Sequence, residues 1–215
     1  MFIGHYAVGF AAKRAAPGAS LGVLIAAAGL ADLLFPVFSL AGWEQVRIEP
    51  GATAVAPFAF IYPLSHSLLT GVGWAVLFAA LYWVWTRYLV GAVTIALAVV
   101  SHWLLDLVTH RPDLPLYPGG TTLAGLGLWN SVAGTVAVEG LLFVAGVWVY
   151  AAMTRPRDRT GRYAFWSFVA LLVVLYAASL LGPPPPRVTA MAVVGLSAWL
   201  FVFWAAWFDR HRTEK

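Results

Sequence analysis

The chain has 215 residues, of which 61% are hydrophobic and 10% are charged, and its formal net charge is +4. Soluble domains contain roughly a quarter of charged residues, so this composition excludes an ordinary soluble protein and indicates a membrane protein. The few basic clusters are typical of orientation signals beside membrane helices, and we expect no nucleic-acid partner. The absence of cysteine excludes disulfides and thiolate metal ligands.

The chain begins with a short apolar segment, FIGHYAVGFAA (2–12), which is followed by the basic residues Lys13 and Arg14. A membrane-spanning helix requires about 20 apolar residues, so this segment is too short to cross a bilayer. Because the basic pair follows the apolar stretch, the segment is not typical of a secretory signal. We predict an interfacial or re-entrant helix that carries His5.

Longer apolar segments follow, and one of them is interrupted by Glu139. The segments long enough to span a bilayer are 20–41, 64–85, 88–109, 129–153, 163–182 and 187–208. The sequence therefore predicts an all-α, polytopic membrane protein with about six transmembrane helices and a short N-terminal helix. We expect a single integral membrane domain over residues 1–215, in which 1–120 form the core of a metal site and 121–215 add further transmembrane helices.

The basic residues predict the orientation of these spans. If six helices alternate in direction, most of the basic residues fall on one side, in segments 13–14, 87, 155–162 and 209–215. The loops on the other side contain only three arginines, and they are 43–57, 111–122 and 183–187. The positive-inside rule then predicts that both termini are cytoplasmic.

Few ionisable side chains lie within the predicted spans, and such residues are functional candidates because a charge at membrane depth is costly. They are Asp32, His66, His102, Asp106 and Glu139, with His110 and Asn130 near the outer span ends. From the helical rise of about 1.5 Å per residue, they lie between the bilayer centre and its outer half. We expect them to meet in one layer of the bundle.

The stretch SHWLLDLVTH (101–110) contains the densest group of these residues. His102 and Asp106 are four residues apart, so both side chains lie on one helix face, and His110 continues the same stripe. Pro112 then ends the helix and leaves Asp113 in the loop. Imidazole and carboxylate ligands suit zinc, manganese or iron, so the pattern predicts half of a divalent-metal site.

Each of these residues also has a purely structural interpretation. His102 alone is compatible with a neutral histidine that bonds a neighbouring carbonyl, and Asp32 is compatible with a hydrogen bond to a serine of another helix. His66 follows Ser65, which is well placed to begin a helix.

The loop side of the predicted site leaves further alternatives open. His110 and Asp113 lie at a loop boundary, where solvated residues are common. Glu139 is either a metal ligand, a general base or a carboxylate that shares a proton with another. The glycine-rich segment LPLYPGGTTLAGLGLWNS (114–131) is either a lid over the site or a connector.

Four motifs together resemble those of a known family: GHYAVG around His5, GLADLLFP with Asp32, SHS at 65–67 and SHWLLD at 101–106. Over residues 1–120 their order is similar to that of bacterial membrane-bound metal-dependent hydrolases, the LexA-binding inner-membrane YdjM-like proteins, which are distantly similar to zinc-dependent phospholipase C. The resemblance implies a multi-pass protein of the bacterial inner (cytoplasmic) membrane with a helical metal-hydrolase core. The metal ligands that it implies are His5, Asp32, His66, His102 and Asp106.

We therefore expect a hydrolase with one or two divalent cations, with zinc first and manganese or iron as alternatives. Glu139 or His110 would be the general base or acid, and Asp113 and Asn130 are further candidates. Because the site would open toward the outer leaflet, the expected partners are membrane lipids and the expected substrate is a lipid or isoprenoid phosphoester.

Two other functions remain open at this point. A small transporter or ion-conducting protein would use the same His/Asp/Glu cluster for proton or substrate binding. A non-catalytic membrane subunit would bind haem through His66 and His102, or a partner protein. The sequence predicts no oligomeric state.

Overall fold

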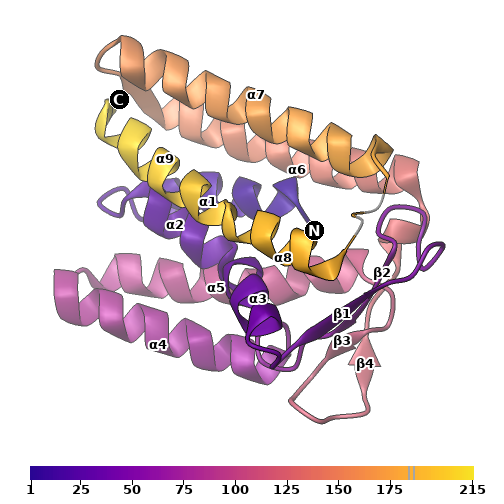
Figure 1. Cartoon of the computed structure of the whole chain (residues 1–215). Helices are drawn as coiled ribbons and strands as arrows, with labels where there is room; N and C mark the ends of the chain where they lie inside the picture. Colours follow the sequence, from indigo (N-terminus) through magenta and orange to yellow (C-terminus); the bar gives the residue numbers. More distant parts are fainter. Residues whose placement is uncertain (184, 186) are drawn as a thin grey trace.

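Long apolar helices make up most of the chain, and the predicted all-α class is confirmed (Figure 1). The computed structural model describes residues 1–183, 185 and 187–215. The helices are α1 (Ile3–Ala15), α2 (Leu21–Ala28), α3 (Leu30–Leu40), α4 (Leu68–Thr86), α5 (Leu89–Thr109), α6 (Val132–Met153), α7 (Arg159–Leu181), α8 (Val188–Leu196) and α9 (Ala198–Arg210), with the short 3-10 helix η1 (Leu128–Asn130). The short strands are β1 (Gln45–Ile48), β2 (Phe58–Ile61), β3 (Leu114–Pro115), β4 (Leu123–Ala124), β5 (Thr154–Pro156) and β6 (Arg212–Glu214).

Five helical segments among the described residues are long and apolar enough to cross a membrane, and they become six if α2 and α3 count as one bent span. They are α4, α5, α6, α7 and the pair α8–α9, with mean hydropathies from 1.7 to 2.3. These segments indicate a membrane protein, and they agree with the predicted spans. One boundary differs: α4 begins at Leu68 after Ser67, whose side chain accepts from Thr70 N, so Ser65 does not begin this helix.

The span at 20–41 is broken where α2 meets α3. The two helices bend by 62° at Gly29, which ends α2 and precedes the first residue of α3. Asp32 therefore lies in the first turn of a new helix, where the helix dipole favours a carboxylate. Because of the break, α3 does not continue the regular backbone hydrogen bonds of α2.

Helix α1 lies inside the bundle, with α2, α5 and α6 packed around it (Figure 1). Small residues allow this close approach. A Cβ added at Gly146 of α6 would lie 2.5 Å from the carbonyl oxygen of Ala7, and one at Gly9 would lie 2.9 Å from Cα of Ile25. The buried position differs from that of an interfacial helix, one of the two predicted placements, because such a helix would leave one face uncovered.

Both ends of α1 are anchored by polar contacts to later helices. At its start, Glu139 of α6 accepts hydrogen bonds from the backbone N–H groups of Phe2 (2.8 Å) and Gly4 (3.4 Å). At its end, the buried Lys13 donates to Asp209 of α9 at 2.8 Å. The two contacts fix the position of α1 along the bundle, and with it the position of His5.

Two strand pairs close one end of the bundle, far from the C-terminus (Figure 1). The antiparallel hairpin β1–β2 aligns Val46 with Phe60, and the pair β3–β4 aligns Leu114 with Ala124. The sequence predicted only loops in these regions. The hairpin matters for the site because Tyr62, which directly follows β2, is buried against Leu114 and other residues of this end.

The contact between α1 and α6 gives a first testable prediction. We expect Gly146→Ala to separate the two helices and to lower the free energy of unfolding by about 1–3 kcal/mol, the usual cost of overpacking. Unfolding in mixed micelles with increasing sodium dodecyl sulfate, followed by tryptophan fluorescence, measures it. The matched control is Gly140→Ala on the same helix, where an added Cβ has no neighbour within 4 Å. Equal loss of stability in both variants would contradict this packing.

Candidate metal centre

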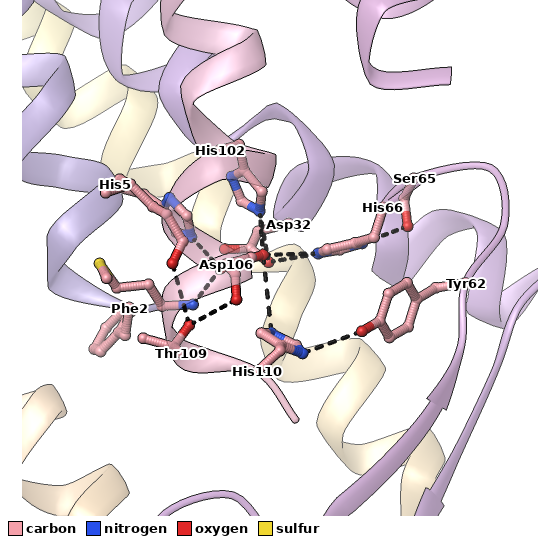
Figure 2. Close-up of polar contacts among 12 residues, drawn as sticks. Phe2, His5, Asp32, Tyr62, Ser65, His66, His102, Asp106, Thr109 and His110 are labelled. Carbon is pink, nitrogen blue, oxygen red and sulfur yellow. Dashed lines mark hydrogen bonds and ion pairs between the residues drawn. The ribbon is translucent and has the colours of Figure 1, made fainter. Parts of the chain in front are cut away.

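The five side chains predicted as metal ligands meet in one cluster, although they come from four separate segments (Figure 2). His5 comes from α1, Asp32 from α3, His66 from the connection between β2 and α4, and His102 and Asp106 from α5. They form two triads, His5–Asp32–His102 and His66–His102–Asp106, and in each triad the possible ligand atoms lie within 4.8 Å of one another. The structure therefore brings these five side chains together; metal binding itself stays a prediction.

Asp106 is at the centre of the cluster and is only 1% exposed. Its Oδ2 lies 3.2 Å from Nε2 of His102, 3.8 Å from Nε2 of His66 and 3.9 Å from Nε2 of His110. Three imidazoles thus direct the same ring atom at one carboxylate oxygen (Figure 2). What these contacts mean depends on where each imidazole carries its proton.

In His102 the proton is on the other ring nitrogen. Its Nδ1 lies 2.8 Å from the carbonyl oxygen of Ala28, and a carbonyl only accepts, so Nδ1 is the donor. Ala28 is the last residue of α2, and the bend at Gly29 leaves its carbonyl available. When the ring is neutral, it presents a lone pair at Nε2, an atom that is buried and has no hydrogen-bond partner.

A serine and a glutamate hold His66 in the same way. The Ser65 hydroxyl donates to Oε2 of Glu44 at 2.7 Å, so its oxygen accepts the proton of His66 Nδ1, also at 2.7 Å. The other carboxylate oxygen of Glu44 accepts the backbone N–H groups of Leu64 and Ser65, both at 2.8 Å. Nε2 of His66 is left as a lone pair that faces the centre.

His110 repeats the arrangement from the end of α5. Its Nδ1 lies 3.0 Å from Oδ1 of Asp113, which also accepts the Tyr62 hydroxyl at 3.0 Å. Burial, with the nearby Asp113 carboxylate, raises the pKa of Tyr62 well above its ordinary value, so the hydroxyl keeps its proton. The ring packs against Trp129, with centroids 4.1 Å apart. His110 ends the helix with extended backbone, yet its Nε2 still faces Asp106.

His5 completes the imidazole set by stacking on His102. The two rings are nearly parallel (7°), with centroids 3.7 Å apart. Nε2 of His5 lies 3.1 Å from Oδ1 of Asp106, which also accepts the amino group of Met1 at 2.5 Å. Nδ1 of His5 is buried without a hydrogen-bond partner.

Asp32 is the accessible member of the cluster. Its Oδ1 lies 3.5 Å from Nε2 of His66 and 3.8 Å from Nε2 of His102, while its side chain is 49% exposed. A cavity of about 740 Å³ reaches Asp32 and also touches Asp106, His110 and Glu139. A ligand in this cavity would therefore contact the cluster directly.

The structure gives different positions to the other predicted site residues, Asp113, Glu139 and Asn130. Asp113 belongs to the site through His110. Glu139 lines the large cavity, but its observed hydrogen bonds hold the start of α1, which is a positioning role. Asn130 is exposed in η1, and no hydrogen bond of the described residues joins its side chain to the cluster.

The glycine-rich segment 114–131 is tied to the end of α5 rather than forming a simple connector. Leu126 N donates to the carbonyl of Leu107, and Gly127 N donates to that of His110, both at 2.7 Å. Gly125 has a φ of +156°, and an added Cβ would lie 2.1 Å from the carbonyl oxygen of Arg111, so this close approach requires glycine. The segment thereby brings Trp129 against the His110 ring.

Three residues of the site were not among the predicted ones: Glu44, Ser65 and Tyr62. Ser65 and Tyr62 lie close to His66 in the sequence, and that proximity was the available signal. Glu44 is 2% exposed although it follows the end of α3 in a region predicted as a loop. Nothing in its local sequence distinguishes it from a solvated loop residue.

Comparison with known proteins provides no relative on which to base a function: no family model, curated protein or solved structure matches the chain. The family resemblance and its metal ligands stay predictions, and the proximity of the five side chains bears only on the ligands.

The hydrogen bond between Ser65 and His66 gives a second prediction. We expect Ser65→Ala to weaken zinc binding by about 10–100-fold, because residues that orient a ligand affect affinity to this extent. Competition with a chromophoric chelator measures the dissociation constant. The matched control is Ser101→Ala beside His102, because the Ser101 hydroxyl donates only to the Ala98 carbonyl of its own helix. Unchanged zinc affinity in Ser65→Ala would argue against this role.

Proposed function

We propose that this protein is a membrane-embedded, metal-dependent hydrolase of a lipid or isoprenoid phosphoester. One observation carries the proposal: the Nε2 lone pairs of His66, His102 and His110 all face Oδ2 of Asp106. A lone pair and a carboxylate oxygen repel one another unless a cation lies between them or the ring is protonated. A divalent cation shared with Asp106 accounts for the contacts of His66 and His102, and a water at the centre accounts for the contact of His110.

The donor set fits zinc, with manganese or iron as alternatives, because it contains imidazole and carboxylate groups and no thiolate. His5, Asp32, His66, His102 and Asp106 would hold one or two ions. When bound, such ions polarise a phosphoryl oxygen and lower the pKa of a coordinated water. The charge balance also favours cations, since three carboxylates (Asp32, Asp106 and Glu139) share the cluster with one amino group.

His110 is the best candidate for the group that moves a proton. Asp113 holds its Nδ1–H, so Nε2 is free to accept a proton from a water at the centre. The Asp113 carboxylate would then stabilise the imidazolium that results. Glu139 supports the reaction by fixing α1, and hence His5, in place.

The location of the cluster supports a substrate from the outer half of the bilayer. The cluster lies at the end of the bundle that is closed by β1–β4 (Figure 1), where the loops contain few basic residues. The basic segment 155–162 lies at the other end, next to the C-terminal strand β6. With the positive-inside rule, we infer a bacterial inner-membrane protein whose C-terminus and basic pair, Lys13 and Arg14, face the cytoplasm, and whose site lies near the outer leaflet. The predicted cytoplasmic N-terminus does not agree with this placement, because the amino group of Met1 donates to Asp106 inside the site.

Metal content and lipid hydrolysis together test the proposal. We expect purified wild-type protein in nanodiscs to contain zinc, manganese or iron, and to release phosphate or a phosphorylated head group from polyprenyl phosphates or phospholipids. A chelator should stop this release, and zinc should restore it.

Asp106→Asn should lose most of the metal and the activity, because it removes the central negative charge without changing the shape. Asp158→Asn is the matched control, since Asp158 is an exposed residue that caps α7. Metal-free wild-type protein, or release that is insensitive to the chelator, would refute the proposal.

The proposed role of His110 gives a separate prediction. We expect His110→Gln to lower kcat by about 10²–10⁴-fold while the zinc content stays close to that of the wild type, because general-base catalysis contributes on this scale. Asp113→Asn should have a smaller effect in the same direction. Asn130→Ala, in the exposed η1, should leave both kcat and the zinc content unchanged. Loss of zinc together with activity in His110→Gln would instead make His110 a ligand.

One observation favours a second function, a small transporter. The bent span α2–α3 places Asp32 beside a helix break, and broken helices form the binding sites of many transporters. Proton- or substrate-coupled uptake into liposomes by metal-free protein would support this function over hydrolysis.

A further inference from the structure

A second, smaller cavity of about 250 Å³ adjoins the candidate metal centre on the side of α8 and α9. Two candidate ligands, Asp32 and His5, line one part of it. The rest of its wall is mainly apolar and comes from α2, α3, α8 and α9: Ile25, Leu33, Ala192, Gly195, Ala198 and Val202.

The two cavities meet at the cluster and extend in different directions. They share Phe2, Asp32, Phe35 and Met191. The larger cavity continues to the β1–β2 loop (53–57) and to the end of α7. The smaller one continues past the break at Gly29 to Ile25 of α2 and Val202 of α9, away from the strand-covered end. Asp32 therefore lies where the two spaces join.

The composition of the smaller cavity indicates its ligand. A cavity with apolar walls does not hold ordered water well and instead binds apolar groups. Small side chains at Ala192, Gly195 and Ala198 leave the space open, and a Cβ at Gly195 would lie only 2.7 Å from Pro36. A slender hydrocarbon chain fits such a space, and a second charged group does not.

We propose that this smaller cavity binds the hydrocarbon chain of the substrate while the phosphate of the same molecule lies beside Asp32, toward the cations that the cluster would hold. The inference rests on the proposed function and makes it more specific: the substrate is a single amphiphile that is recognised at both its phosphate and its chain. Chain length then contributes to the affinity for a ligand taken up from water, by roughly fourfold for each methylene buried. An acyl chain and a prenyl chain share this chemistry.

Binding of non-hydrolysable phosphonates tests the chain site independently of turnover. Calorimetry would compare butyl-, octyl- and dodecylphosphonate with geranyl- and farnesylphosphonate, using zinc-loaded protein in nanodiscs and empty nanodiscs for subtraction. In the wild type we expect affinity to rise with chain length and then to level off when the cavity is full. The steeper of the two series identifies the acyl or the prenyl chain as the better fit.

Substitutions in the wall of the smaller cavity test whether this cavity causes the dependence of affinity on chain length. Ala198→Phe should fill the cavity, weaken binding of the longest chain by at least about tenfold, the effect of roughly two methylenes, and leave butylphosphonate unchanged. Leu200→Phe is the matched control, because Leu200 lies on the same helix and is 66% exposed. Ile25→Ala enlarges the cavity, so affinity should stop rising only at a longer chain length than in the wild type. This variant replaces Ala198→Phe in the test if Ala198→Phe does not fold.

The outcomes separate this inference from the proposed hydrolase. One outcome is that affinity depends on chain length, that Ala198→Phe removes this dependence, and that no metal-dependent hydrolysis is found. This outcome would support the chain site and refute the hydrolase. Hydrolysis with affinities independent of chain length, or with equal effects of Ala198→Phe and Leu200→Phe, would overturn the chain site. Dodecanol binding as tightly as dodecylphosphonate would also overturn it, since the cavity would then bind lipid chains without reference to the cluster.

Discussion

The buried carboxylate of Asp106 is the constraint on which the arrangement of the other elements depends. A carboxylate that is 1% exposed within an apolar bundle has lost its water, and this loss is costly unless positive charge and hydrogen-bond donors replace the water. The structure places one amino group and four imidazoles from three segments of chain around it, and the charge of a bound cation would complete the compensation. Helix α1 and its N-terminal residues bring Met1 and His5 to this carboxylate, and α5 carries it together with His102.

Three of the four imidazoles, those of His66, His102 and His110, are oriented by a hydrogen bond at Nδ1, and each has a different partner. The break at Gly29 provides a carbonyl for His102, the buried Glu44 acts through Ser65 on His66, and Asp113 holds His110. In each case Nδ1 is the donor and Nε2 points to the centre. A site assembled from such rings is preorganised, because the rings do not need to reorient when a ligand arrives.

The irregular parts of the fold serve the same centre. The hairpin β1–β2 leads into Tyr62 and Ser65, the segment 114–131 packs Trp129 on His110, and the bent span exposes Asp32 to both cavities. Irregular backbone is tolerated inside membrane proteins where it is enclosed by protein or lines a cavity. The regular helices form the apolar outer surface, and the residues of the candidate metal centre lie at the end that the strands cover.

Hydropathy and helical spacing are properties of neighbouring residues, and for this reason the sequence by itself determined the spans, the all-α class and the shared face of His102 and Asp106. The rarity of ionisable residues at membrane depth also singled out Asp32, His66, His102 and Asp106, and the family resemblance added His5 to this set. Only the tertiary structure decided the rest: the position of α1 within the bundle, the anchoring role of Glu139, the exposure of Asn130 and the part played by Glu44. These depend on which groups face one another across distant segments, and a carboxylate in a loop has the same local sequence whether it is buried against a serine or solvated. The orientation of His102 is decided at that level too, since its Nδ1 donates to the carbonyl of Ala28 from another helix.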